Sequence, residues 1–154
     1  MNTELEKIVD WFNINKLSLN PDKTNYILFR SPRKKINDIN LYLNKIPITR
    51  SHTSKFLGVI IDEYLSWKDH VAVVCKKVSK NIGIIAKIKY CLSFQNLKNL
   101  YYTLIFPYLS YCNIVWGTNY KSSLKYLNTL HKRIIRIICG LPWHTSTRAK
   151  FLRT

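Results

Sequence analysis

The spacing of apolar residues changes near residue 65, and this change limits the folds open to the chain. Before that point, apolar residues form short runs bounded by turn-forming residues such as Asn20-Pro21-Asp22 and Ser31-Pro32. From Ser66 onward they recur at the spacing of a helix with one buried face. We therefore expect an α+β chain with two domains, residues 1–64 and residues 65–154.

The first domain is expected to hold one helix and a small antiparallel sheet. The helix is predicted at residues 3–15, with Thr3 as its N-cap. Four runs have the composition of strands: residues 25–30, 39–43, 46–49 and 54–61. The middle two alternate around Asn44-Lys45, as the arms of a hairpin do. Gly58, inside the last run, indicates a bulge or a close backbone approach.

The second domain is expected to be a helical bundle. One helix is predicted from Ser66, its N-cap, to about Cys91, and a second from Ser93, broken at Pro107. A third should begin at Ser122 or Ser123 and end at Gly140-Leu141-Pro142. The residues expected to face inward are Val71, Val74, Val78, Ile82, Ile85, Ile88, Leu97, Leu100, Tyr101, Leu104, Ile105, Leu127, Leu130, Ile134, Ile137 and Leu141.

The chain is strongly basic, and its charge is uneven. Its 154 residues include 25 Lys and Arg against 8 Asp and Glu, a formal net charge of +17. Residues 65–154 hold 15 of the basic residues and one acid, Asp69. Such a surface calls for an anionic partner, first nucleic acid and second a membrane surface.

A stretch without charge raises the question of a membrane. Residues 99–120 contain no charged side chain, and a span needs about 20 apolar residues. The stretch also contains Pro107, five tyrosines and several other polar residues, which are costly in lipid. Buried helices broken at Pro107 are the preferred interpretation. The acidic, polar start of the chain predicts no signal peptide, and we expect an intracellular protein of the nucleus or cytoplasm.

Residues suited to catalysis or metal binding are sparse. The four cysteines lie far apart and are expected to be buried free thiols, while His131, Cys139 and His144 lack a fourth metal ligand at a usable spacing. Asp62-Glu63 follows a strand, and we expect this pair to be solvated. The sequence offers no complete catalytic constellation.

Basic residues on the outer helix faces are the strongest candidates for binding. They are Lys76, Lys77, Lys80 and Lys87 on the first long helix, and Lys132, Arg133 and Arg136 on the last. Cations in such rows neutralise phosphates and release counterions. The pattern favours contact with a nucleic-acid backbone over recognition of bases.

Several motifs, taken in order, resemble one protein family. They are WFNINKLSLNPDKTNYILF at residues 11–29, KFLGVIIDEYLSWKDHV at 55–71, LYYTLIFPYLSYCNIVWG at 100–117 and LHKRIIRII at 130–138. Their order and spacing are similar to those of reverse transcriptases (RNA-directed DNA polymerases) from jockey-like non-LTR retrotransposons, in the segment after the catalytic aspartates.

The resemblance implies roles for particular residues. Lys23 matches the motif D lysine of the palm, a proton donor to pyrophosphate, although a surface lysine in a turn fits equally well. The positions of Phe56, Leu57 and Gly58 match the motif E primer grip. Residues 1–64 would then be the end of a palm. The helices after Ser66 would be a thumb that clamps duplex.

The same resemblance predicts what this chain lacks. The fingers, the palm strand with its paired aspartates and the Mg²⁺ that they hold would belong to the full-length enzyme, so this chain alone should be inactive. It would bind RNA, DNA or an RNA–DNA hybrid, and no membrane. A stand-alone basic nucleic-acid-binding module and a membrane-associated helical protein remain as alternatives.

Overall fold

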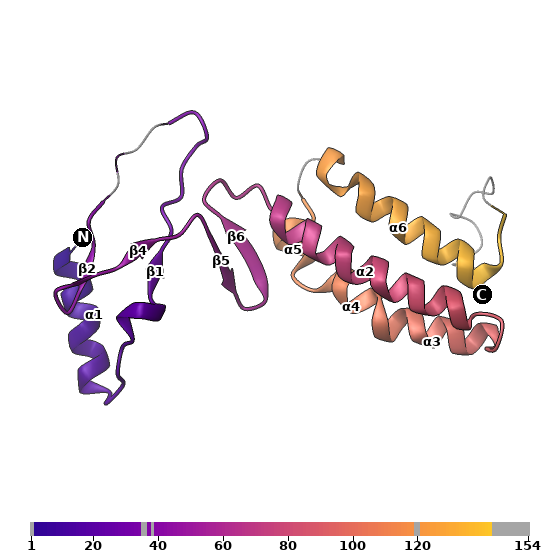
Figure 1. Ribbon diagram of the computed structural model, residues 1–154, viewed down its shortest axis with the longest axis horizontal. Helices are drawn as coiled ribbons and strands as arrows, with labels where there is room; N and C mark the ends of the chain where they lie inside the picture. The colour runs from indigo at the N-terminus through magenta and orange to yellow at the C-terminus, as the bar shows by residue number, and fades with distance from the viewer. Residues whose placement is uncertain (1, 35–36, 38, 119–120, 143–154) are drawn as a thin grey trace. The chain divides into compact units, whose positions relative to one another are not determined.

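The computed structural model describes residues 2–34, 37, 39–118 and 121–142. The chain divides into two compact units, Met1–Ser66 (unit 1) and Trp67–Thr154 (unit 2). Figure 1 shows that unit 1 combines one long helix with short strands, whereas unit 2 is helical. The expected α+β class is therefore confirmed.

Unit 1 opens with α1 (Asn2–Ile14). The helix already includes Thr3, so the predicted N-cap at that residue is wrong. The side chain of Asn2 instead accepts a hydrogen bond from the Tyr42 amide at 3.3 Å. Val9 is the buried residue of α1, and it packs in a small core with Leu41, Leu43 and Ile48.

The strands of unit 1 form pairs, so the expectation of one antiparallel sheet is wrong. Within the described residues there are three two-stranded pairs. The pairs are β1 (Asn25–Tyr26) with β4 (Thr49–Arg50), β2 (Tyr42–Leu43) with β3 (Ile46–Pro47), and β5 (Thr53–Phe56) with β6 (Val59–Asp62). The β1–β4 pair is parallel. The run 25–30 leaves β1 after Tyr26, and the Arg30 amide instead donates to the carbonyl of Glu63 at 3.0 Å.

The hairpin predicted around Asn44-Lys45 is confirmed. Leu43 pairs with Ile46 across the turn, in antiparallel register. Asn44 and Lys45 both have positive φ angles, 51° and 65°, which is the geometry of the turn that matches strand twist. Pro47 is the last residue of β3, and a proline, which lacks an N–H group, is tolerated at the end of a strand.

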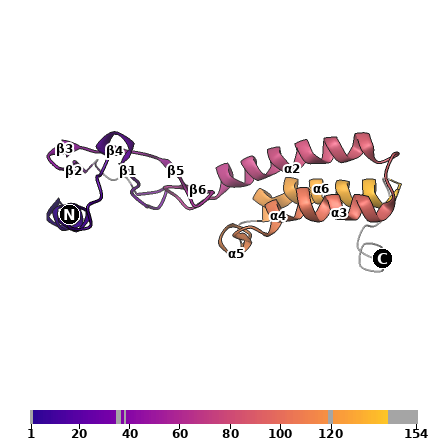
Figure 2. The ribbon, with the colours of Figure 1, turned by 90° about the horizontal axis from the view of Figure 1, so that it is seen from below.

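Unit 2 is built around one central helix. α2 (Lys68–Ile88) packs against α6 (Lys121–Cys139), α3 (Phe94–Leu104) and α4 (Phe106–Ser110), and α3 also packs against α6. Figures 1 and 2 both show these helices running side by side. The short α5 (Asn113–Trp116) precedes α6.

The ends of the helices agree with the sequence-based predictions at some positions and differ at others. Ser93 caps α3 by accepting a hydrogen bond from the Asn96 amide at 3.3 Å, and Pro107 opens α4, as predicted. Gly140, with φ 61°, ends α6. The predicted cap at Ser66 is wrong, because Trp67 precedes α2 with φ 58° and makes no side-chain cap. The predicted start of α6 is also late, since that helix begins at Lys121.

The core of unit 2 is close to the one predicted. Its buried residues are Val71, Val74, Cys75, Val78, Ile82, Ile85, Leu97, Tyr101, Ile105, Trp116, Leu127, Leu130, Ile134 and Ile138. The prediction differs mainly at the end of α6. Ile135 and Ile138 are buried there, whereas Ile137 is partly buried and Leu141 lies beyond the helix.

The uncharged segment is divided among short helices. Its described part, residues 99–118, contributes to α3, α4 and α5, which are interrupted at Ile105 and Tyr111. No helix in the described ranges is both long and apolar enough to cross a membrane.

Candidate nucleic-acid interface

The β5–β6 hairpin presents an apolar tip. The sequence predicted one strand with a bulge at Gly58, but the chain turns back there and Phe56 pairs with Val59. Leu57 and Gly58 have φ angles of 46° and 85°, so these two residues make the turn. Phe56 is 62% exposed and Leu57 74% exposed, and the tip is therefore available for contact.

Lys23 lies in a short, capped turn of unit 1. The turn is η1 (Pro21–Lys23), and the side chain of Asn20 caps it by accepting from the Asp22 amide at 3.1 Å. Thr24 braces the same loop by donating to the Asn20 carbonyl at 2.7 Å. The Lys23 side chain is exposed, on a different loop from the hairpin tip.

A buried cluster of charges holds the base of the hairpin. Arg30 donates two hydrogen bonds to the Glu63 carboxylate, from Nε at 3.2 Å and from Nη2 at 3.1 Å. Arg50 donates a third, from Nη2 to Oε2 at 2.8 Å. The Glu63 amide also donates to the His52 carbonyl at 3.0 Å. The cluster thus joins three segments of unit 1 that are distant in sequence.

The expectation that Asp62-Glu63 is solvated is wrong. The exposed fractions of Asp62 and Glu63 are 6% and 5%. The Asp62 carboxylate accepts from the amides of Tyr64 and Ser66 at 3.2 and 3.1 Å, which turns the chain after β6. Hydrogen bonding from Arg30 is the main cause that lowers the pKa of Glu63 from 4.5 to about 2. Its position beside two arginines could not be read from a pair of acids after a strand.

These carboxylates do not fit a catalytic metal site. Two-metal phosphoryl transfer needs carboxylate oxygens that converge on the ions. The oxygens of Asp62 and Glu63 are engaged by amides and by guanidinium groups, respectively. In the described part of the chain, no group of three or more His, Cys, Asp or Glu side chains could hold a metal ion.

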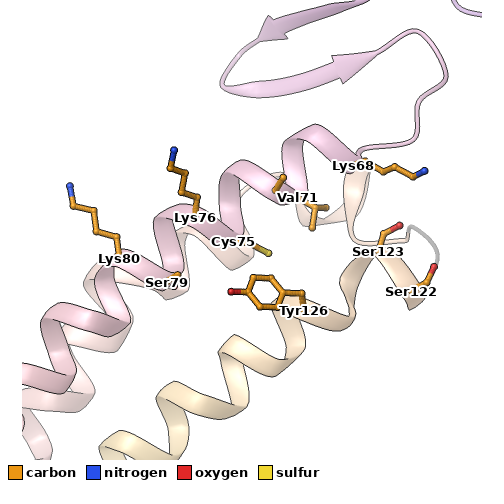
Figure 3. Close-up of a pocket in the computed structure, with 10 residues that line it drawn as sticks. Lys68, Val71, Cys75, Lys76, Ser79, Lys80, Ser122, Ser123 and Tyr126 are labelled. Atoms are coloured by element: carbon orange, nitrogen blue, oxygen red, sulfur yellow. The ribbon is translucent and has the colours of Figure 1, made fainter.

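A groove between α2 and α6 brings several cations together. We call it the α2–α6 groove; its volume is about 820 Å³, and it is lined by Lys68, Val71, Ala72, Cys75, Lys76, Ser79, Lys80, Ser122, Ser123 and Tyr126. Figure 3 shows Lys76 and Lys80 extending from α2 in the same direction, while the Tyr126 ring projects from α6 toward Cys75 and Ser79. The lysines follow one another along one stripe of α2.

A second cavity, the α6-end cavity, adjoins Tyr126. It has a volume of about 730 Å³, and it is lined by Lys89, Tyr126, Thr129, Leu130, Arg133, Arg136, Ile137, Gly140, Leu141 and Pro142. Tyr126 therefore borders both hollows. Three cations line each cavity, and the described residues that line the two include no carboxylate.

The predicted binding residues are only partly gathered by this surface. Lys76 and Lys80 line the groove, and Arg133 and Arg136 line the α6-end cavity. Three others line neither cavity: Lys77, Lys87 and Lys132. The Lys77 ammonium lies 5.3 Å from the centre of the Tyr108 ring, on another side of α2.

Sequence reasoning missed three residues of this surface. Lys68 and Lys89 flank α2 at its two ends, and Tyr126 stands between the cavities. Lys68, Lys76 and Lys80 are spaced by eight and four residues, which places them along one stripe of a helix. The sequence spacing alone could therefore have identified Lys68. The neighbourhood of Tyr126 depends on how α2 and α6 pack.

The described histidines and cysteines considered as metal ligands or buried thiols line neither the α2–α6 groove nor the α6-end cavity, except Cys75. The His131 ring nitrogen Nε2 lies 2.8 Å from the Tyr101 hydroxyl, and His144 is outside the described residues. Burial lowers the pKa of His131 and raises that of Tyr101 to about 12. The expectation of buried thiols is right for Cys75 and wrong for Cys91, which is exposed.

Three curated proteins from fruit flies match nearly the whole chain. A probable RNA-directed DNA polymerase from the transposon X-element of Drosophila melanogaster is 24% identical over 138 residues, 87% of this chain. The RNA-directed DNA polymerases from mobile element jockey are 25% identical in Drosophila funebris and 26% in Drosophila melanogaster, each over 94% of this chain. This chain is thus similar in sequence to part of the RNA-directed DNA polymerases of jockey-like mobile elements.

The relationship confirms the resemblance drawn from the motifs. The chain spans 15–16% of the length of these curated relatives. No protein-family model and no solved structure matches it. The similarity to RNA-directed DNA polymerases is therefore a similarity of sequence. The assignment of the two units to a palm end and a thumb belongs to the proposal below.

Proposed function

We propose that this reverse transcriptase segment binds and positions a primer–template duplex and does not itself catalyse polymerisation. Unit 2 would act as the thumb and unit 1 as the end of the palm. The observation that carries the proposal is the row of six cations around the two cavities, with no carboxylate among the lining residues. Phosphates of a duplex are the natural counterions of such a surface.

The dimensions of the surface suit a duplex. Lys68 and Lys89 are 21 residues apart along a continuous helical backbone, which at 1.5 Å per residue is about 31 Å. One turn of B-form DNA occupies about 34 Å. The cations could therefore contact phosphates along most of a turn. Contacts of this kind position the duplex without reading its sequence.

The α2–α6 groove can be tested with a matched pair of variants. In filter binding to an RNA–DNA hybrid, the double variant Lys76→Ala, Lys80→Ala should weaken binding and reduce the salt slope by about two. Lys77→Ala removes a cation from the same helix, but from a position that lines neither cavity. It should change the slope little, and an equal loss in this control would contradict a role for the groove.

The β5–β6 hairpin is proposed to contact the primer end. Its tip exposes Phe56 and Leu57, and Gly58 leaves room for close backbone approach. A primer carrying a photoreactive group at its 3′ end should cross-link to the tip residues. Cross-links confined to unit 2 would count against the proposal.

Lys23 is proposed as a general acid in the complete polymerase. Its exposed ammonium on a capped turn could reach a leaving pyrophosphate. With this segment grafted into a catalytically complete jockey-like polymerase, Lys23→Ala should slow single-turnover nucleotide addition by about a hundredfold. An unchanged rate would leave Lys23 as a surface residue.

The absence of catalysis is tested by primer extension with Mg²⁺ and nucleotides. The adjacent carboxylates of Asp62 and Glu63 are engaged by an amide and a guanidinium group, and no group of three or more His, Cys, Asp or Glu side chains among the described residues could hold a metal ion. We expect no incorporation by this chain, in conditions where a complete jockey-like polymerase extends the primer. Robust incorporation would overturn this part of the proposal.

A further inference from the structure

The α2–α6 groove has a feature that contact with a paired backbone does not require. Its lining includes Val71, Ala72 and Cys75. In Figure 3 the ring of Tyr126 projects from α6 toward Cys75 and Ser79. Tyr126 is 59% exposed. A duplex offers phosphates, sugars and the edges of its bases to a protein surface, whereas the faces of its bases are stacked inside. Apolar lining residues and an exposed ring contribute little to binding of that kind.

Unpaired nucleotides present a different chemistry. Their bases have apolar faces that stack on aromatic side chains, while their phosphates still seek cations. The α2–α6 groove has both an aromatic ring and cations among its lining residues. Lys76 and Lys80 line its α2 side, with their side chains extending away from Tyr126 in Figure 3, while Ser122, Ser123 and Tyr126 line its α6 side.

We propose that Tyr126 and the apolar lining residues of the groove hold an unpaired nucleotide beside the bound duplex. The ligand class is a strand end or overhang at a junction of paired and unpaired nucleic acid. The inference rests on the proposed function, because the cations of the two cavities would hold the duplex itself.

The position of Tyr126 supports this assignment. The residue borders both cavities, so a base stacked on its ring would have cations on either side. A flexible strand that leaves a duplex can follow such a path, whereas a base inside a duplex must first be unstacked.

The experiment compares three ligands by fluorescence anisotropy with the full chain. They are a blunt RNA–DNA hybrid, the same hybrid with a single-stranded RNA overhang, and the hybrid with an abasic overhang of equal length. The base-bearing overhang should bind about tenfold more tightly than the abasic one, the gain expected from a stacked base. The abasic ligand carries the same phosphates, so it controls for added charge.

Substitutions test whether the tighter binding of the base-bearing overhang depends on Tyr126. Tyr126→Ala should abolish the difference between the base-bearing and abasic overhangs, and Tyr126→Phe, which keeps the ring, should preserve it. Tyr90→Ala is the matched control, since Tyr90 is 86% exposed, lies near Lys89 and lines neither cavity. It should leave the difference unchanged.

The outcomes separate this inference from the function on which it rests. If the blunt hybrid binds but the two overhangs bind equally, the stacking site is wrong and duplex binding stands. Equal loss of the gain in Tyr90→Ala and Tyr126→Ala would also overturn the site. If the blunt hybrid itself does not bind at low salt, the proposed function fails. The comparison of overhangs uses the unmodified chain, so it decides the matter even if a variant folds poorly.

Discussion

At the scale of single residues, the Glu63 carboxylate is held between two arginines of unit 1. It is shared between the guanidinium groups of Arg30 and Arg50, whose side chains are 17% and 15% exposed. Hydrogen bonds to charged partners stabilise an ionised carboxylate more than neutral ones do. Because the three residues come from separate segments, the pairing stabilises the arrangement of these segments in unit 1.

Glu63 makes the stability of unit 1 dependent on acid pH. Its folded pKa, about 2, lies below the ordinary value of 4.5. The stabilisation is therefore complete above about pH 4.5 and is lost as the pH falls toward 2. In urea unfolding followed across this range, Glu63→Gln should be less stable than the unmodified chain at pH 7 and should lose less on acidification.

A matched control for Glu63→Gln is Glu4→Gln. Glu4 pairs with Lys7 at 2.9 Å on an exposed face of α1, and such pairs contribute little. Its substitution should leave both the stability at pH 7 and the acid dependence nearly unchanged. Parallel pH profiles for Glu63→Gln and the unmodified chain would contradict the assigned role of Glu63.

At the scale of elements, the orientation of α2 can be tested by substituting two adjacent isoleucines that differ in burial. Ile85 is fully buried in the core of unit 2, whereas Ile84 is 44% exposed. Ile85→Ala should cost about 2–5 kcal/mol of stability, because it removes buried surface and leaves a cavity. Ile84→Ala should cost much less, as measured by chemical denaturation. Similar losses would mean that α2 is rotated from the orientation described.

The β5–β6 turn places a residue under conformational strain. Leu57 has a φ of 46°, a left-handed conformation that asparagine tolerates better than leucine. With Gly58 next in sequence, Leu57→Asn would create the Asn-Gly pair favoured in such turns. It should stabilise the hairpin, and slower amide hydrogen exchange at β5 and β6 would reveal this. Faster exchange would contradict the turn geometry.

The elements also show what the sequence can predict. Helical spacing and the cap at Ser93 gave the helices of unit 2 and most of their buried faces, because these signals are local. The turn at Leu57-Gly58 was missed, since leucine is an unusual residue for a left-handed turn and the apolar run around it looks continuous. The contacts of Glu63 were missed because they join distant segments.

At the scale of the whole molecule, charge separates the two units. Residues 1–64 hold 10 basic and 7 acidic residues, whereas residues 65–154 hold 15 basic residues and one acid. Composition could therefore predict that the second part needs an anionic partner. It could not predict which cations meet at one surface, since this depends on how α2 and α6 pack. The structure gathers Lys68, Lys76 and Lys80 on one side of that packing and leaves Lys77 outside it.

The salt dependence of binding to an RNA–DNA hybrid tests the central claim most directly. If the six cations of the two cavities contact phosphates, log K should fall linearly with log salt concentration with a slope near −5, about −0.9 per contact. The measurement needs only the full chain and a blunt hybrid, titrated across a salt series. A slope shallower than about −2, or no binding at low salt, would contradict the account of unit 2 as a duplex-holding surface.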